Sequence, residues 1–349
     1  MLKLGTLTAT LGLATAMFVA APAPSHAADT ITLRLGTATT TKWSIGIAIR
    51  DVLATALDKH SNGRIKLEAH YGRSLCSEHS CVEQMRLGQI DIATVSSGNV
   101  GAFGTTFDII NLPYLFKDAK SASRILNGWL AKALSEKANA DMGMQALAVI
   151  PVGGFRQLDN TVREVRVPAD LKGIKIRVTK SPTEFNLIKA WGGVPVPYDW
   201  SALYEGLQTG VVQGMYLQDT FTSATKMYEV VKHITHVGGA WSAHPILMDQ
   251  KRYEKLPAWA QEAVTKAAAD LQRESFAIDA AWIGRATKGL DQKVKIYKPN
   301  DAEMQLWYKG ARTAWAKMKG AYDPAMARRA LEEQGQTALI KELESAGAL

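Results

Sequence analysis

The sequence Asp170-Leu-Lys-Gly-Ile-Lys-Ile-Arg-Val178 decides the fold of this chain. In its second half, isoleucine and valine alternate with Lys175 and Arg177, and this period of two predicts a strand that buries one face. The alternation places both cations on the same face. At the carboxyl end of a strand, a guanidinium meets a carboxylate with two parallel, charge-assisted hydrogen bonds. The stretch therefore predicts an anion site at Arg177, with an ordinary surface arginine as the alternative.

Two further segments follow in a fixed order and spacing. They read Gly192-Gly-Val-Pro-Val-Pro-Tyr-Asp-Trp-Ser-Ala-Leu-Tyr204 and Leu207-Gln-Thr-Gly-Val-Val-Gln-Gly214. Together with Asp170–Val178 they resemble the DctP-type solute-binding proteins of TRAP (tripartite ATP-independent periplasmic) transporters, and weaker similarity covers the rest of the mature chain. The resemblance implies an α/β, two-lobed periplasmic binding protein of type II, with a ligand cleft between the lobes and a long helix that spans both.

The first residues predict export. Lys3 precedes an apolar run from Leu11 to Ala21, and small residues lead up to Ala27. This pattern is typical of a secretory signal peptide at residues 1–27, cleaved after about Ala27. The alternative is a membrane anchor, but the run is shorter than the roughly 20 apolar residues that span a bilayer. We therefore expect a periplasmic protein.

The length and charge of the chain limit its class. The mature chain exceeds the roughly 250 to 300 residues at which one core usually stops growing, so two lobes are expected. The predicted division gives residues 28–153 with about 243–282 to domain I, and residues 154–242 with about 283–349 to domain II. The formal charge of +8 is scattered, without a basic tail or an aromatic-basic module, which argues against nucleic-acid binding.

The hydrophobic pattern predicts a parallel α/β sheet in each lobe. Because ligands bind beyond the carboxyl ends of parallel strands, loops 37–44, 76–81 and 96–103 face the predicted site. Two amphipathic helices near the carboxyl end, at 301–318 and 324–346, are expected on the outside of the second lobe. The remaining predicted strands are 32–36, 65–69, 90–95, 145–152, 174–178, 194–196 and 211–217; the helices are 47–57, 84–87, 119–140, 183–191, 202–209 and 253–290.

The sequence lacks a convincing catalytic or metal motif. It has no Gly-x-Ser-x-Gly elbow, phosphate-binding loop or His-Glu-x-x-His, so we expect no enzyme activity and no cofactor. Cys76 and Cys81 predict a local disulfide in an exported protein; the alternative is a metal site with His79. His233, His236 and His244 are close in sequence, but His233 would point the opposite way along a strand, so no metal is expected.

The resemblance implies which residues bind the ligand. Gly153-Gly-Phe-Arg156 corresponds to the crossing between lobes, where Arg156 supplies a second cation for the carboxylate that Arg177 binds. Trp200 corresponds to an aromatic that packs on the ligand, beside Tyr216. Closure of the first lobe brings further residues onto the far end of the ligand. That set is Trp43, Glu78, Ser96, Ser97 and Asn99, and Phe155, Gln218 and Trp241 complete the predicted site.

Departures from the family pattern point to a ligand class. Leu217 stands where many members have an asparagine that bonds the carboxylate, so Gln218 or Tyr216 is expected to compensate. Ser96 replaces an acidic residue of some sugar-acid binders. Together with the aromatic residues, these departures favour an aromatic or bulky apolar monocarboxylate. The alternatives are a C4-dicarboxylate and a hydroxy or keto acid, whose hydroxyl group Glu78 would hold.

The resemblance also implies a partner for the loaded protein. It would dock on the small and large membrane subunits of a TRAP permease, which this chain does not contain. The alternative is a periplasmic ligand-sensing subunit of a signalling receptor, which would use the same fold and a different docking partner.

Overall fold

The computed structural model describes residues 1–2 and 30–349, so the predicted signal peptide and its cleavage site lie outside the described residues. The described strands form a ten-stranded sheet, in the order β2-β1-β3-β9-β4-β7-β5-β6; in addition, β8 pairs with β4, and β10 pairs with β8. Their bounds are β1 Ile31–Gly36, β2 Ile65–His70, β3 Ile92–Thr94, β4 Met144–Asn160, β5 Lys175–Val178, β6 Val194–Pro197, β7 Gly214–Gln218, β8 His233–Thr235, β9 Trp241–Asp249 and β10 Lys295–Tyr297.

Strand β4 runs through both parts of the sheet. It pairs antiparallel with β9 up to Phe155 and with β7 from Arg156 onward. At the change of partner, Gly153 and Gly154 have φ angles of 72° and 86°, a conformation that glycine adopts without a steric cost. The glycine pair therefore allows the strand to change partner at this point. We call β1, β2, β3, β9 and the part of β4 up to Val152 the first half, and the remaining strands the second half.

The two prolines of β6 fit its place at the end of the order of strands. Pro195 and Pro197 lack an amide donor, so they are tolerated only where a strand has no partner on one side. In the structure β6 pairs with β5 alone and ends the order of strands.

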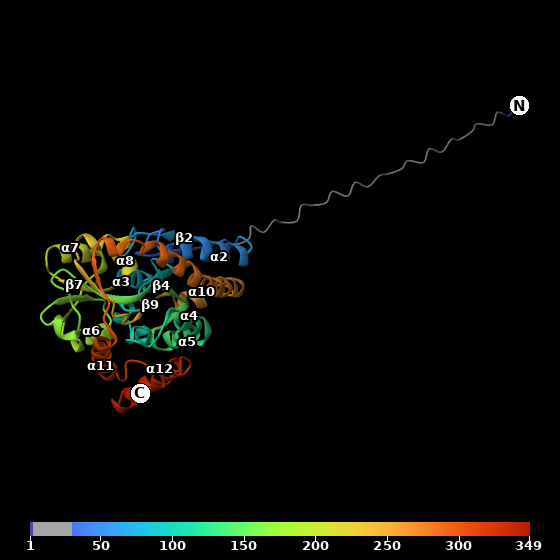
Figure 1. Ribbon diagram of the computed structural model, residues 1–349. Coiled ribbons are helices and arrows are strands. Elements are labelled where there is room, and N and C mark those ends of the chain that lie inside the picture. The colour runs from blue at the N-terminus through green and yellow to red at the C-terminus, as the bar shows by residue number, and fades with distance from the viewer. Residues whose placement is uncertain (3–29) are drawn as a thin grey trace.

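Helices cover the sheet (Figure 1). Most predicted helices are present, although the one expected at 84–87 begins earlier, at Glu78. The α-helices are α1 Ser44–Ala48, α2 Ala54–His60, α3 Glu78–Arg86, α4 Ala119–Ile125, α5 Ala131–Met142, α6 Pro182–Ala190, α7 Leu203–Gln208, α8 Asp219–Ala224, α9 Gln250–Glu254, α10 Ala258–Ala286, α11 Asp301–Lys317, α12 Pro324–Glu332 and α13 Thr337–Ser345. A π-helical turn, Ile49–Leu53, joins α1 to α2, and another, Leu126–Leu130, joins α4 to α5.

The long helix predicted at 253–290 is present but shorter. Pro257 separates α9 from α10, because proline cannot continue a helix from the preceding turn. Helix α10 has 29 residues and spans about 43 Å at 1.5 Å per residue. It packs on α1, α2 and β4 and reaches α8 in the second half, and Figure 1 shows it alongside α2 and α8. No described helix combines the length and apolar character needed to cross a membrane.

The C-terminal helices differ from the prediction. Helix α11 packs on α6 and buries Trp307 in the core of the second half, as expected. Trp315, at the end of α11, and Leu331 and Leu343 of α12 and α13 are instead buried against residues of the first half, among them Leu115. Figure 1 shows α11 next to α6 and α12 farther on. The last helices therefore link the two halves, which an amphipathic pattern cannot predict because it does not identify the partner surface.

Candidate ligand-binding site

A narrow cavity of about 30 Å³ lies between the two halves, and we call it the cleft. The first half lines it with Ala38, Thr39, Trp43, Glu78, Ser96, Asn99 and His244, and the second half with Arg156, Arg177, Thr179, Trp200, Leu217, Gln218 and Phe221. Several of these residues follow strands β1, β3 and β5 at their carboxyl ends, where a parallel sheet is expected to bind its ligand. All three predicted loops contribute.

Arg177 enters the cleft from the carboxyl end of β5. Its side chain is 2% exposed, and its Nε donates a hydrogen bond to the carbonyl oxygen of Tyr198 at 3.0 Å. Burial lowers the pKa of Arg177 to about 10, so the group stays charged at neutral pH. Within the described residues its two Nη groups donate no hydrogen bond, which leaves the fork of the guanidinium available. Lys175, on the same strand, is exposed because it lies at the end away from the cleft.

Arg156 is the second buried cation, and it already has partners. Its Nη1 donates to the carbonyl oxygen of Tyr216 at 2.9 Å, and its Nε lies 3.2 Å from Oε1 of Glu184, which is fully buried. Removing one member of such a pair leaves an uncompensated buried charge. Arg156 is therefore held in place by Glu184, whereas Arg177 faces the cleft with two Nη groups that make no hydrogen bond to the described residues.

The opposite wall of the cleft holds a buried carboxylate. Glu78 is the first residue of α3, and its Oε2 accepts hydrogen bonds from the hydroxyl of Ser96 at 2.7 Å, the amide of Ser96 at 3.3 Å and the side chain of Asn99. Burial alone would raise the pKa of Glu78, but the hydrogen bonds from Asn99 and Ser96 and the positive charge of Arg177 favour the ionised form, and the pKa is lowered. Glu78 is thus ionised, and within the described residues its Oε1 accepts no hydrogen bond.

The disulfide predicted between Cys76 and Cys81 is present. Both half-cystines are buried, at 5% and 0% exposure, and they flank Glu78 in sequence. The bridge therefore fixes the turn that presents this carboxylate to the cleft. It also excludes the alternative of a thiolate metal site with His79.

His244 of β9 stands beside Glu78. Burial lowers its pKa to about 4, so the imidazole is neutral at pH 7. Its Nε2 lies 3.9 Å from Oε1 of Glu78, which is too long for a hydrogen bond. From the sequence alone, His244 was considered only as a metal ligand. No cluster of histidine, cysteine and acidic residues in the described chain could hold a metal ion.

Three aromatic rings form the apolar wall. Trp43 comes from the first half, and Trp200 and Phe221 come from the second. The ring centres of Trp43 and Phe221 are 5.0 Å apart, and those of Trp43 and Trp200 are 6.3 Å apart, both edge to face. Phe221 was not predicted from the sequence, because α8 surrounds it with polar residues and no motif marks it.

The cleft brings together eight of the twelve residues predicted to bind ligand: Arg177, Arg156, Trp200, Trp43, Glu78, Ser96, Asn99 and Gln218. Four do not line it. Tyr216 packs against Trp191 in the core of the second half, and the hydroxyl of Ser97 donates to Asn111. Phe155 and Trp241 stack edge to face at 5.0 Å, away from the cleft.

On β4, neighbouring residues point to opposite faces, so Arg156 faces the cleft while Phe155 does not. On β7, Leu217 and the last residue, Gln218, both line the cleft, whereas Tyr216 packs in the core of the second half. Tyr216 therefore cannot replace the asparagine that Leu217 lacks. Gln218 does line the cleft, but its Nε2 donates to the carbonyl oxygen of Val152 at 3.0 Å.

The fold and the site together define a two-lobed binding protein. A family model described as "Bacterial extracellular solute-binding protein, family 7" (DctP) matches residues 35–321, and this chain belongs to that family. The resemblance noted in the sequence is thereby confirmed. The family consists of solute-binding receptors rather than enzymes, which agrees with the lack of a catalytic motif.

Individual relatives agree with this assignment. A solute-binding protein of Verminephrobacter eiseniae is 33% identical over 69% of this chain and 71% of its own length. The 2,3-diketo-L-gulonate-binding periplasmic protein of Escherichia coli is 27% identical over 64% of this chain and 68% of its own length. A TRAP periplasmic solute-binding protein from Bordetella, whose crystal contains density assigned to pantoate, superposes with a TM-score of 0.79 at 24% identity, covering 86% of this chain and 98% of that one.

Proposed function

We propose that this protein captures a small organic monocarboxylate in the periplasm and delivers it to a TRAP permease. The observation that carries the proposal is Arg177: a buried guanidinium in the cleft, with Nε held by a backbone carbonyl and both Nη groups open. A carboxylate would meet these two donors side by side. The relative named for diketogulonate and the neighbour with density assigned to pantoate also take organic acids.

The apolar wall favours a ligand with an apolar body. Trp43, Trp200 and Phe221 surround the space next to Arg177, and Leu217 adds a further apolar contact. Burial of apolar surface against such rings contributes roughly 25 cal/mol per Å². An aromatic or bulky apolar body uses this wall best.

The far wall favours a hydroxyl over a second carboxylate. Oε1 of Glu78 is ionised and open, so it accepts a hydrogen bond from a hydroxyl and repels an anion. His244 is neutral and adds no compensating positive charge. We therefore favour a monocarboxylate with an apolar body and a hydroxyl group over a C4-dicarboxylate.

Capture and delivery follow from the two-lobed form. A ligand that contacts Arg177 on one half and Glu78 on the other holds the halves together and excludes water, which strengthens the ionic contact. The loaded form would dock on the small and large permease subunits. A sensor subunit of a receptor is the alternative, and the docking partner distinguishes the two.

A thermal-shift screen tests the proposal, since a ligand that binds only folded protein raises the melting temperature. We expect mandelate, which has an aromatic ring, a carboxylate and a hydroxyl, to raise it most. Phenylacetate lacks the hydroxyl and should raise it less, and succinate least. 1-Phenylethane-1,2-diol is the matched neutral control and should have no effect. Equal shifts with the diol and with mandelate would refute binding through the carboxylate.

A further inference from the structure

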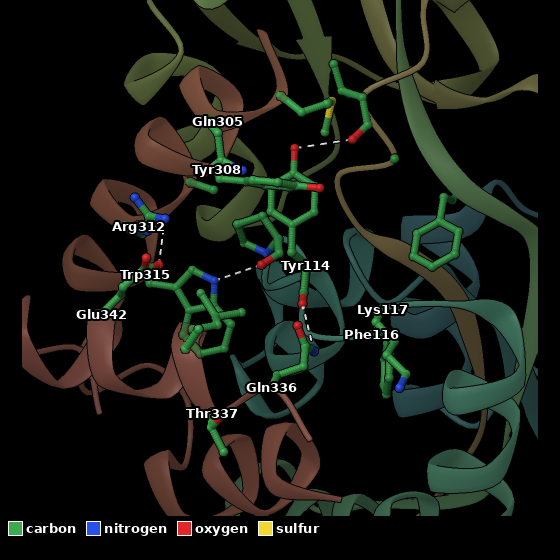
Figure 2. Close-up of a pocket in the computed structure, with 18 of the residues that line it drawn as sticks. Tyr114, Phe116, Lys117, Gln305, Tyr308, Arg312, Trp315, Gln336, Thr337 and Glu342 are labelled. Atoms are coloured by element: carbon green, nitrogen blue, oxygen red, sulfur yellow. Dashed lines mark hydrogen bonds and ion pairs between the residues drawn. The ribbon is translucent and has the colours of Figure 1, made fainter. Parts of the chain in front are cut away.

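A second and larger cavity of about 600 Å³ lies on the other side of β4. We call it the rear cavity. Its walls are the segment Pro113–Lys117, the loop His236–Gly238, helix α11 and the first turn of α13. Figure 2 shows Tyr114 near its centre, with Tyr308 and Trp315 from α11 on one side and Phe116 and Lys117 on the other. None of its lining residues is shared with the cleft.

The size and lining of the rear cavity suit a small molecule. Ligand pockets typically measure about 300 to 1,000 Å³ and are lined mainly by apolar and aromatic side chains with a few placed polar groups. Here Tyr114 and Tyr308 pack edge to face with ring centres 4.6 Å apart. The indole nitrogen of Trp315 donates to the carbonyl oxygen of Pro113 at 2.8 Å, so the ring is fixed in the wall.

The polar groups of the rear cavity leave a net positive charge. Arg312 pairs with Glu342 at 2.5 Å, and its Nε is buried with no partner among the described residues. The ammonium of Lys117 donates one hydrogen bond, to the carbonyl oxygen of Gln334 at 3.1 Å, and an ammonium carries three donors. The one acidic residue of the wall is already paired, so the charge of Lys117 is uncompensated within this lining.

The rear cavity is adjacent to the cleft through the backbone. Phe155 lines the rear cavity and the next residue, Arg156, lines the cleft. The amide of Gly239 donates to the carbonyl oxygen of Arg156 at 3.1 Å, and the amide of Tyr114 donates to the carbonyl oxygen of Gly239 at 2.6 Å. A molecule against Tyr114 and Val237 would therefore contact the segment that these hydrogen bonds join to Arg156.

We propose that the rear cavity is a second binding site, which takes a small molecule with an aromatic or apolar body and one negative charge. The aromatic side chains provide the apolar contacts, Lys117 provides the countercharge, and the Nε of Arg312 provides a hydrogen-bond donor. This site is independent of the solute that binds at Arg177.

Fluorescence titration with 8-anilinonaphthalene-1-sulfonate tests the proposal, because this probe is an aromatic monoanion that brightens when water is excluded. We expect saturable binding to the native protein. The Tyr308→Ala variant loses an aromatic contact and should bind about fivefold more weakly. The matched control, Tyr253→Ala, alters a tyrosine outside the lining and should bind as the wild type does.

The contribution of the Lys117 charge to probe binding is tested separately. The Lys117→Met variant should bind the sulfonate about threefold more weakly and should bind the uncharged analogue N-phenyl-1-naphthylamine as tightly as the wild type does. Lys319→Met, outside the lining, is the control. Absence of saturable binding, or Tyr308→Ala and Lys117→Met titrations that match their controls, would overturn the proposal.

The cleft arginine separates this proposal from the proposed function. The Arg177→Ala variant should bind the sulfonate probe as tightly as the wild type does, even where it no longer binds mandelate. Loss of probe binding in this variant would locate the probe in the cleft and overturn a second site. Loss of mandelate binding alone supports both proposals.

Discussion

The two walls of the cleft differ in how many hydrogen bonds their charged side chains already make. Arg177 on the second half is held by a single backbone acceptor and keeps both Nη groups open. Glu78 on the first half has one oxygen bonded by Ser96 and Asn99, and only its other oxygen is open. The wall of the second half can therefore bind an anionic group, and the wall of the first half can accept one hydrogen bond. Four variants test this difference, and they follow in order of decreasing expected effect.

The largest expected effect is a loss of folding stability at acid pH, caused by protonation of His244. Its pKa is about 4 in the folded protein and about 6.5 when unfolded. Because the pKa is lower in the folded protein, the unfolded chain binds a proton at His244 at a higher pH than the folded protein does. The contribution of neutral His244 to stability is therefore complete above about pH 6.5 and is lost progressively as the pH falls to about 4. Integrated over that window, the loss is on the order of 3 kcal/mol.

The measurement is the free energy of unfolding by denaturant between pH 4 and pH 7. We expect the His244→Asn variant to lose much less stability on acidification than the wild type does. His70→Asn alters a histidine outside the cleft and should keep the wild-type slope. A His244→Asn slope equal to the wild-type slope would contradict the lowered pKa of His244.

The next effect is expected at Arg177. The Arg177→Ala variant should bind the best monocarboxylate of the screen at least about 30-fold more weakly, because a buried carboxylate loses its ionic partner at a cost of roughly 2 kcal/mol or more. The melting temperature without ligand should change little, since burial already disfavours the charged guanidinium. Calorimetric titration measures the affinity, and Lys175→Ala on the same strand is the control. Unaltered binding would remove Arg177 from the site.

A smaller effect should appear as a change in selectivity at Glu78. In Glu78→Gln the repulsion of a second carboxylate is lost, so succinate should bind about fivefold more tightly than to the wild type. Mandelate should bind somewhat more weakly. Glu83→Gln alters an exposed carboxylate on the same helix and should leave both affinities unchanged. If the preference between mandelate and succinate does not move, the far wall does not select the ligand.

The smallest effect is expected at Leu217. The Leu217→Asn variant introduces a hydrogen-bond donor beside Arg177 and should tighten monocarboxylate binding by about threefold. Its melting temperature should fall, because a buried apolar side chain that is 3% exposed becomes polar. Calorimetry with the ligand used for Arg177→Ala makes the comparison direct. Weaker binding in this variant would mean that the apolar contact of Leu217 matters more than an added donor.

Parts of the fold and site were predictable because local signals specify them. The change of partner along β4 falls at the Gly153-Gly154 pair that the resemblance assigns to the crossing between lobes, and the prolines of β6 suit an edge strand because they lack amide donors. The position of Arg177 followed from strand alternation together with a loop at the strand's end. These features depend on backbone conformation and on a period of two, and both can be read from neighbouring residues.

Other parts depend on contacts between distant residues. Strand β7 is buried throughout, so polarity does not reveal which side chains face the cleft, and Leu217 rather than Tyr216 does so. Burial lowers the pKa of His244 beside the carboxylate of Glu78, and that burial arises only in the folded chain.

Local sequence signals identified seven of the ten described strands, the glycine pair at the crossing, the disulfide and the place of Arg177 at the carboxyl end of a strand. They did not identify β8, β9 and β10, and they did not predict that Arg177 is buried. Tertiary structure decided which face of a fully buried strand lines the cleft, and it decided that the end of α11, α12 and α13 pack on the first half. It also created the rear cavity. The physical reason is that burial and packing depend on surfaces contributed by segments far apart in the chain, which no local pattern encodes.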